Sequence, residues 1–370
     1  MAEERMRVLE MIRDGKITAE EGARLLEALK AAEGQPAAGS APSRREDDPV
    51  GAIASMVADV LQSRGWGAWG GWGGSGGWRG SWSSGPLGGL ERRKRREAEG
   101  WEFLPLSEGD HGTFDLPEGA RLSVETEAGG IEARAGDGPA RLDLEGEGLM
   151  NYAVYVARKD QEVVLSSYRT EHHARMPQLK VSVPRHVTHV KLRTSGGGLH
   201  TAGLTCPVSL HTSGGGIHVK EQGEGVVEAR TSGGGIDVEG RPARIDLHTS
   251  GGGIHFRGRT DAVEARTSGG SITIDGARLT AGEHHAQTAG GSVRVRLARE
   301  SSVEFTAQTS AGSIHVDLPG VEGQQTGSRI SPRYRGSFNG SGARLELKTA
   351  AGSVSVGLAE SWSGGDTGRG

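Results

Sequence analysis

A short phrase that returns eight times between Val190 and Leu358 constrains this chain more than any other feature. It reads Thr-Ser-Gly-Gly-Gly followed by Leu or Ile in the first four copies and becomes degenerate in the later ones. The phrases begin at Thr194, Thr212, Thr231, Thr249, Thr267, Thr288, Thr309 and Thr349, and successive threonines lie 18, 19, 18, 18, 21, 21 and 40 residues apart. A nearly fixed period of about 20 residues is typical of a solenoid, in which each repeat forms one coil.

Apolar residues alternate with polar ones on both sides of each phrase. Ile245 and Leu247 precede Thr249, and Ile254 and Phe256 follow its glycines. A period of two predicts two short strands, each with one buried face, joined by a sharp corner. We attribute the glycines of this corner to a need for positive φ. By parity the threonine points inward, so its buried hydroxyl needs a partner in a neighbouring threonine or a corner amide.

One such coil cannot be stable alone. Its few inward aliphatic side chains contribute ~1.5–3 kcal/mol each, whereas every ordered residue costs ~1–2 kcal/mol of backbone entropy. Coils must therefore stack on one another. We predict a mainly β fold, a parallel β-solenoid or β-helix with 18 to 21 residues per coil.

The residues between the inward positions form columns on the outer faces. Before each threonine, a mostly basic column lies beside a partly acidic one, which is typical of a solvated sheet. After the glycines comes a row in which histidine recurs. Metal binding, anion binding and pH sensing remain alternatives to a plain solvated face, which we favour because other residue types interrupt the row. The row contains His200, His218, Asp237, His255, Thr273, Arg294 and His315.

Composition excludes several classes of protein. Glycine supplies 63 of the 370 residues and aromatic residues only 4%, so the core must be aliphatic and thin. The formal charge of −4 argues against a nucleic-acid partner. Cys206 is the only cysteine, so neither a disulfide framework nor a thiolate zinc site is expected. We predict no metal and no cofactor. The N-terminal residues do not resemble a signal peptide and no apolar run could span a membrane, which predicts a cytoplasmic location.

The chain divides into four predicted segments. Residues 1–33 form a helical hairpin, with Gly15 ending the first helix and Thr18 and Glu21 capping the second. Residues 34–100 form a linker, 101–358 the solenoid, and 359–370 a disordered tail. The hairpin helices are short, so we expect the hairpin to self-associate or to dock elsewhere.

The linker contains features that suggest either a disordered spacer or a reversible membrane anchor. Tryptophan favours the headgroup region of a bilayer, and basic clusters favour anionic lipid. The candidate membrane contacts are Ile53, Val57 and Leu61 on a short helix at 49–62, then Trp66, Trp69, Trp72, Trp78 and Trp82 in a Gly/Ser-rich tract, then Arg92, Arg93, Lys94, Arg95 and Arg96.

The two ends of the solenoid are degenerate. Residues 122–131 repeat the phrase weakly and predict the first coil, and further strands are expected near 150–157, 162–168 and 178–183. The 40-residue gap before Thr349 contains residues 319–338, which form either one degenerate coil or a protruding loop. Solenoids need distinct ends because an open sheet edge promotes aggregation.

The repeated phrase, preceded by Leu179-Lys-Val-Ser-Val-Pro184, resembles the bacterial "putative adhesin" β-strand-repeat family of unknown function over residues 101–358. The hairpin is similar to the helical domain of envelope-stress proteins of Gram-positive bacteria. The resemblance implies a non-enzymatic protein linked to envelope stress or surface interaction. Many relatives have Asp where this chain has Gly in the corner, and the Trp/Gly and basic segment is an insertion, so no binding site carries over.

We therefore predict a structural or interaction scaffold, with a protein or envelope component as partner and residues 3–33 as an oligomerisation or docking element. One alternative is a carbohydrate-active β-helix enzyme, which needs clustered carboxylates that the columns do not show. A calcium-binding nonapeptide repeat is excluded because the period is twice too long. The other alternative is a peripheral membrane sensor that works through residues 49–96 at the inner membrane face.

Overall fold

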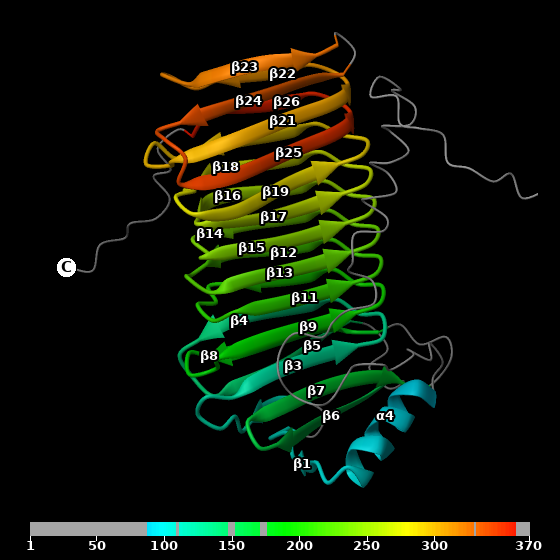
Figure 1. The fold of residues 1–370 in the computed structure, drawn as a ribbon. Coiled ribbons are helices and arrows are strands. Elements are labelled where there is room, and N and C mark those ends of the chain that lie inside the picture. Colours follow the sequence, from blue (N-terminus) through cyan, green and yellow to red (C-terminus); the bar gives the residue numbers. More distant parts are fainter. Residues whose placement is uncertain (1–86, 109–110, 147–151, 171–175, 329–330, 360–370) are drawn as a thin grey trace, which may run out of the picture. The chain divides into compact units, whose positions relative to one another are not determined.

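The computed structural model describes residues 87–108, 111–146, 152–170, 176–328 and 331–359 (Figure 1). The predicted hairpin at 1–33, the helix at 49–62, the tryptophan tract and the C-terminal tail lie outside these residues. Within the described part of the chain, no helix is long and apolar enough to cross a membrane.

The described strands form two sheets that run along one stack of coils (Figure 1). In spatial order, the 14-stranded first sheet contains β1 (Glu102–Leu104), β6 (Tyr152–Lys159), β7 (Glu162–Arg169), β3 (Arg121–Thr126), β9 (His189–Thr194), β11 (Val208–Thr212), β13 (Val226–Thr231), β15 (Arg244–Thr249), β17 (Ala262–Thr267), β19 (Gly282–Thr288), β25 (Ala343–Ala351), β21 (Val303–Ala311), β24 (Pro332–Phe338) and β23 (Glu322–Gly327). The 12-stranded second sheet contains β2 (Gly112–Phe114), β5 (Ala140–Glu145), β8 (Gln178–Pro184), β4 (Ile131–Gly136), β10 (Leu199–Ala202), β12 (Ile217–Gln222), β14 (Ile236–Gly240), β16 (Ile254–Thr260), β18 (Ile272–Ala277), β20 (Val293–Leu297), β26 (Val354–Leu358) and β22 (Ile314–Asp317).

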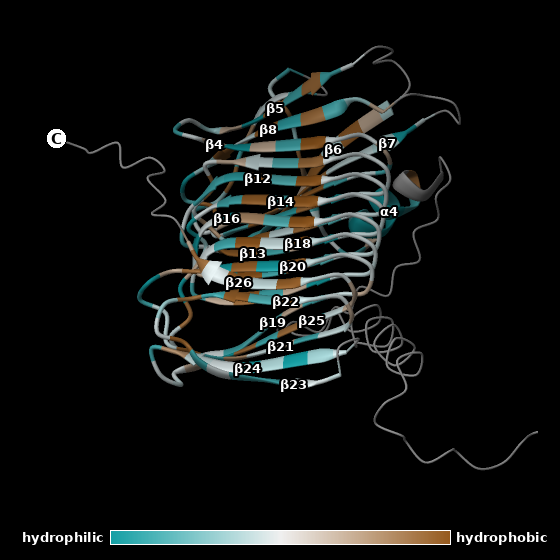
Figure 2. Ribbon diagram, turned by 90° about the horizontal axis from the view of Figure 1, so that it is seen from above, coloured by the Kyte–Doolittle hydropathy of each residue, from teal (hydrophilic) through white to brown (hydrophobic). Residues whose placement is uncertain are grey.

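Each coil contributes one strand to each sheet, and equivalent residues pair in parallel register. Thr231 pairs with Thr249 on the first sheet, and Ile236 pairs with Ile254 on the second. The inward aliphatic side chains form one continuous buried cluster between the sheets. Figure 2 shows the hydrophobic residues of successive strands aligned with one another. The predicted parallel β-solenoid is confirmed.

The coils do not stack in chain order at the two ends. The first coil of the sequence, β3 and β4, lies between the coil of β7 and β8 and the coil of β9 and β10. At the other end the last coil of the sequence, β25 and β26, lies between the coil of β19 and β20 and the coil of β21 and β22. The period of the phrases does not indicate this exchange, because a period specifies coil length and not coil order.

Antiparallel strands extend the sheets beyond the outermost coils. At the N-terminal end, β6 pairs with β7 and β5 pairs with β8. At the C-terminal end, β24 pairs with β21 and β23 with β24. Residues 319–338 are therefore neither a degenerate coil nor a loop, but mainly a hairpin that lengthens the first sheet. The outermost strand β23 is fully exposed and contains Glu322, Gln324 and Gln325, a polar composition that discourages edge pairing.

Residues that were assigned to the linker form the helix α4 (Leu87–Ala98), which contains the whole basic run. Gly100 lies just after the helix, and its φ of +77° is the left-handed conformation that glycine adopts easily. The amide of Trp101 donates to the carbonyl of Arg96, and the amide of Gly100 donates to that of Glu97. This pair of bonds is a Schellman motif, which connects α4 tightly to β1.

Candidate functional site

The threonines of the repeat lie inside the solenoid, as their parity predicts, and each bonds across a corner. The hydroxyl of Thr249 accepts a hydrogen bond from the amide of Gly252 at 3.3 Å and donates one to the carbonyl of Gly234 in the preceding coil at 2.7 Å. The partners are thus a corner amide and a corner carbonyl, and not a neighbouring threonine. The same donation to a corner carbonyl is made by Thr194, Thr212, Thr231, Thr267, Thr288, Thr309 and Thr349.

The corner glycines are required for a reason other than the one we inferred from the sequence. The glycines with positive φ do not include Gly215, Gly234 or Gly252. A Cβ atom at Gly252 would instead overlap the backbone of Gly234 in the preceding coil, and the same holds for each neighbouring pair of corners. Close approach of backbones, and not a left-handed conformation, therefore excludes side chains there. Threonines and glycines together are structural and offer no ligand site.

In the C-terminal half of the first sheet, acidic and basic side chains on the outer face lie in pairs. The carboxylate of Asp246 lies 2.8 Å from His248, that of Glu264 lies 2.8 Å from Arg266, and that of Glu346 lies 2.7 Å from Lys348. His285 lies 3.3 Å from Glu346 on the adjacent strand. Hydrogen bonds from His285 and then Lys348 lower the pKa of Glu346 to about 2, and the bond with Glu346 raises the pKa of His285.

The same face is basic in its N-terminal half. Lys191 and Arg193 lie on β9, His211 on β11 and Arg230 on β13, and we call these four residues the basic cluster. Burial lowers the pKa of Lys191, Arg193 and His211, and for His211 the charges of Arg193, Arg230 and Lys191 add to it and bring the pKa to about 4. Outward-facing side chains of this sheet are therefore partly desolvated over β9 and β11.

Helix α4 packs beside this cluster, and two residues of the basic run, Arg92 and Arg96, make the contacts. Arg96 lies 3.2 Å from Glu125, which is only 1% exposed, and Arg92 lies 3.2 Å from Glu127. Arg93 and Arg96 also lie over aromatic rings, with 5.5 Å to Phe103 and 5.6 Å to Trp101. The sequence grouped Arg92–Arg96 as candidate membrane contacts, but the structure places Arg92 and Arg96 against the solenoid. Arg93, Lys94 and Arg95 are exposed.

The histidine row lies on the outer face of the second sheet. The rings of His200 and His218 stack with centroids 4.9 Å apart and an interplanar angle of 10°, and burial followed by the charge of His218 lowers the pKa of His200. His255 lies 3.7 Å from Asp237. A shallow groove of about 380 Å³ runs over this row beside the glycine corner. No three His, Cys, Asp or Glu side chains of the described residues are placed to hold a metal ion.

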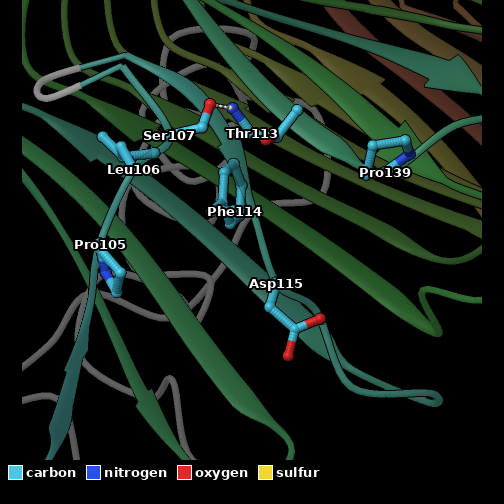
Figure 3. Close-up of a pocket in the computed structure, with 7 residues that line it drawn as sticks. All are labelled: Pro105, Leu106, Ser107, Thr113, Phe114, Asp115 and Pro139. Atoms are coloured by element: carbon cyan, nitrogen blue, oxygen red, sulfur yellow. Dashed lines mark hydrogen bonds between the residues drawn. The ribbon is translucent and has the colours of Figure 1, made fainter.

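A second shallow groove, of about 350 Å³, lies at the N-terminal end of the stack (Figure 3). Pro105, Leu106, Phe114 and Pro139 supply most of its apolar lining, and the amide of Thr113 donates to the hydroxyl of Ser107 at 2.8 Å. The residues come from β2 and the segments on either side of it, except for Pro139, which directly precedes β5. Because no motif marks them, sequence reasoning did not find this groove.

The in-register coils, the internal threonine bonds and the capped ends define a β-solenoid repeat protein. Residues 178–357 match the Toastrack DUF4097 family, which confirms the resemblance to a β-strand-repeat family of unknown function. Residues 3–34 match a SHOCT-like domain.

Two solved structures show similarity to the chain. A "putative adhesin" from Bacteroides fragilis is 16% identical with a TM-score of 0.41, over 66% of this chain and 95% of that one. A "putative cell adhesion protein" from Clostridium sporogenes is 8% identical with a TM-score of 0.26, over 66% of this chain and 96% of that one. No curated protein matches the chain.

Proposed function

We propose that this protein is a non-enzymatic interaction scaffold whose solenoid presents two long, flat outer faces to protein or envelope partners. The observation that carries this proposal is the in-register stacking of the coils, which sets equivalent outward side chains about 4.8 Å apart along each face. Such a periodic surface is rigid and extended, as in other solenoids that bind along a face. A specific protein interface needs about 800 Å² per partner, which faces of 14 and 12 strands provide.

The charge pattern of the faces argues for binding and against glycoside hydrolysis. A glycosidase uses two carboxyl groups about 5–9.5 Å apart, one of which is free to donate a proton. On the first sheet, Glu264 and Glu346 are each bound by a cation two residues further along the same strand, and Asp246 lies in the same way beside the ring of His248. Burial would raise the pKa of Asp246, but the hydrogen bond and charge of His248, together with nearby arginine charges, outweigh it and lower the pKa. The hydrogen bond with His285 lowers the pKa of Glu346. These two carboxyl groups therefore suit recognition of a charged partner better than acid catalysis.

The cellular setting is part of the proposal. The SHOCT-like segment at 3–34 serves as the docking or self-association element, and the resemblance to envelope-stress proteins supports a role in envelope stress or surface interaction, at the cytoplasmic side of the membrane. A peripheral membrane function through residues 49–96 is the second candidate. The exposed Arg93, Lys94 and Arg95 favour it, although Arg92 and Arg96 are bound to glutamates.

The test uses the full chain as bait against envelope and soluble fractions, with captured proteins quantified by mass spectrometry. One variant removes two carboxylates from the outer face of the first sheet (Asp246→Asn, Glu264→Gln). Its matched control removes two carboxylates from the outer face of the second sheet (Asp237→Asn, Asp275→Asn). A partner that is lost with one variant and kept with the other supports a face-specific scaffold. A partner set that both variants leave unchanged, or saturable release of reducing sugar from a polysaccharide, would overturn it.

A further inference from the structure

An inward position of β19 holds a histidine, His284, where the neighbouring coils have apolar side chains. β19 lies between β17 and β25 in the first sheet (Figure 1). His284 pairs with Leu345 of β25, and the residue is only 3% exposed. The corresponding positions along the stack hold Val227, Ile245, Val263, Leu345 and Phe305. A side chain that can bind a proton is therefore enclosed between apolar neighbours in the core.

Backbone groups use both ring nitrogens of His284. Nε2 lies 2.9 Å from the carbonyl oxygen of Ala281, in the segment that leads into β19, and the amide of Val263 on β17 donates to Nδ1 at 3.4 Å. A carbonyl can only accept and an amide can only donate, so the ring carries its single proton on Nε2. These two hydrogen bonds therefore require the neutral form of the imidazole.

The bond to Val263 closes a gap in the first sheet. Between β15 and β17 the pairing includes Ile245 with Val263, but between β17 and β19 it begins one residue later, at Glu264 with His285. The gap coincides with the lengthening of the period from 18 to 21 residues at Thr288. The imidazole thus supplies the acceptor for a buried amide that lies outside the pairing of the two strands.

The surroundings of His284 oppose a positive charge on the ring. Burial lowers its pKa most, the bond to the carbonyl of Ala281 acts in the opposite direction, and the charges of His285 and Arg244 lower the pKa further. The carboxylates of the segments packed around the ring do not compensate, because each of them already lies beside a cation. These pairs are Asp261 with Arg278, Glu264 with Arg266, Glu283 with Arg344, and Glu346 with Lys348.

We propose that His284 is an acid-operated release in the solenoid: uptake of a proton by its ring separates β19 from β17 and opens the stack at this joint. The added proton on Nδ1 would face the amide of Val263, so two donors would meet where an acceptor is needed, and the charge would lie in the core. Separation frees the edges of both strands and interrupts the outer faces between two coils. This inference goes beyond the proposed function, because the faces can bind partners whether or not the stack responds to acid.

Acid favours the open joint because only there is the ring free to take up a proton. An exposed histidine has a pKa of about 6.5, whereas the pKa of His284 in the closed joint is lowered. The stabilising contribution of the neutral ring is therefore complete above about pH 6.5 and is lost as pH falls towards the lowered value. Within that window the ratio of open to closed joints should rise by up to about tenfold per pH unit.

The first experiment measures hydrogen exchange at the Val263 amide of the full chain by NMR, from about pH 7.5 to about pH 5. The protection factor, corrected for the intrinsic effect of pH on exchange, should fall by up to about tenfold per pH unit below about pH 6.5. The amide of Ile245, one coil earlier, lies outside the joint and should keep its protection. A constant protection factor at Val263 would overturn the proposal. An equal fall at Ile245 would also overturn it, because the whole stack would then be unfolding.

The second experiment removes the titrating group and keeps the hydrogen bonds. The side chain in His284→Gln can accept from Val263 and donate to Ala281 but takes up no proton, so the fall in protection should disappear. His284→Leu, with the side chain of the paired Leu345, is a second variant that cannot titrate. His285→Gln is the matched control on the outer face and should retain the fall. A fall that survives in both His284 variants, or that disappears in His285→Gln, would contradict the proposal, and thermal melts at about pH 7.5 verify that each variant folds.

Discussion

The middle and the ends of the solenoid differ in the order in which their coils stack. From β9 to β18 the coils follow one another in chain order, and each repeats the same threonine and glycine contacts. At each end the order is exchanged, so that a coil from the end of the sequence lies inside the stack and antiparallel strands cover the outermost coil. Each coil in the middle of the stack is therefore stabilised by equivalent contacts with the coils next to it in sequence. The stack at each end depends instead on contacts with one segment that is distant in sequence.

The largest expected effect comes from removing a coil at the two kinds of position. Deletion of residues 231–248, one 18-residue period, should leave a shorter folded solenoid, because Arg230 would then lead directly into the equivalent Thr249. A chain that stops at Gly342 loses β25 and β26, which pair on both sides. We expect it to lose its cooperative melt and to aggregate, as measured by circular dichroism and size-exclusion chromatography.

The opposite outcome for the truncated chain is informative. A cooperative melt after truncation at Gly342 would mean that β21 pairs directly with β19 and that the exchange of order is not required. The deletion of residues 231–248 is the matched control, since it also removes one coil.

A smaller effect is expected from a methyl group at a corner. Gly252→Ala places a Cβ atom against the backbone of Gly234, which should cost about 1–3 kcal/mol of unfolding free energy, the usual cost of overpacking. Gly138→Ala is the control, because a Cβ atom there meets nothing within 4 Å. Urea denaturation measures both. Equal stability of the two variants would show that neighbouring corners can move apart without a loss of unfolding free energy.

The threonine hydroxyl should contribute differently in the middle and at the end. Thr249→Val removes a hydroxyl that makes two hydrogen bonds, so we expect a loss of about 1 kcal/mol. Thr126 of the first coil is as buried, but its hydroxyl has no hydrogen-bond partner among the described residues, so Thr126→Val should be neutral or stabilising. Denaturant melts of the two valine variants decide this, and equal losses would contradict the assigned bonds.

The smallest effect concerns pH and the His285–Glu346 pair near the C-terminal end. Glu346 has a lowered pKa of about 2, so its contribution is present above its unfolded pKa and is lost as pH falls through that lowered value. His285 has a raised pKa, so its contribution is present below its unfolded pKa and is lost as pH rises through the raised value. The pair should stabilise most between about pH 4.3 and 6.5. The melting temperature of the parent, compared with that of His285→Gln from pH 2 to 9, should show its largest difference in this window.

The sequence predicts the middle of the solenoid better than its ends. The period, the strand parity, the inward threonines and the first coil at 122–131 were all predictable, because the phrase recurs and an inference from one copy applies to the others. The exchange of coils was not, since Thr349 carries no mark of which coil it will contact. Helix α4 was missed for another reason: it has no apolar stripe, and what holds it is Glu125 and Glu127, about 30 residues further along the chain.

The candidate contacts divide in the same way. The structural threonines lie where the sequence predicted them. The basic run was taken as one unit, yet a helix separates its residues into different faces, so that Arg92 and Arg96 turn to the solenoid while Lys94 does not. The apolar helix positions Ile53, Val57 and Leu61 and the five tryptophans lie outside the described residues, and their roles stay predictions.

The position of the final coil has a consequence for how the protein is made. A ribosome releases residues 343–358 after every other coil has emerged, yet these residues pair between two coils that were synthesised earlier. The C-terminal end of the stack therefore cannot close until residues 343–358 have left the ribosome. A chain that lacks residues 343–358 leaves the edges of β19 and β21 without their partner strand β25. A protease or chaperone that binds exposed strands would recognise these edges.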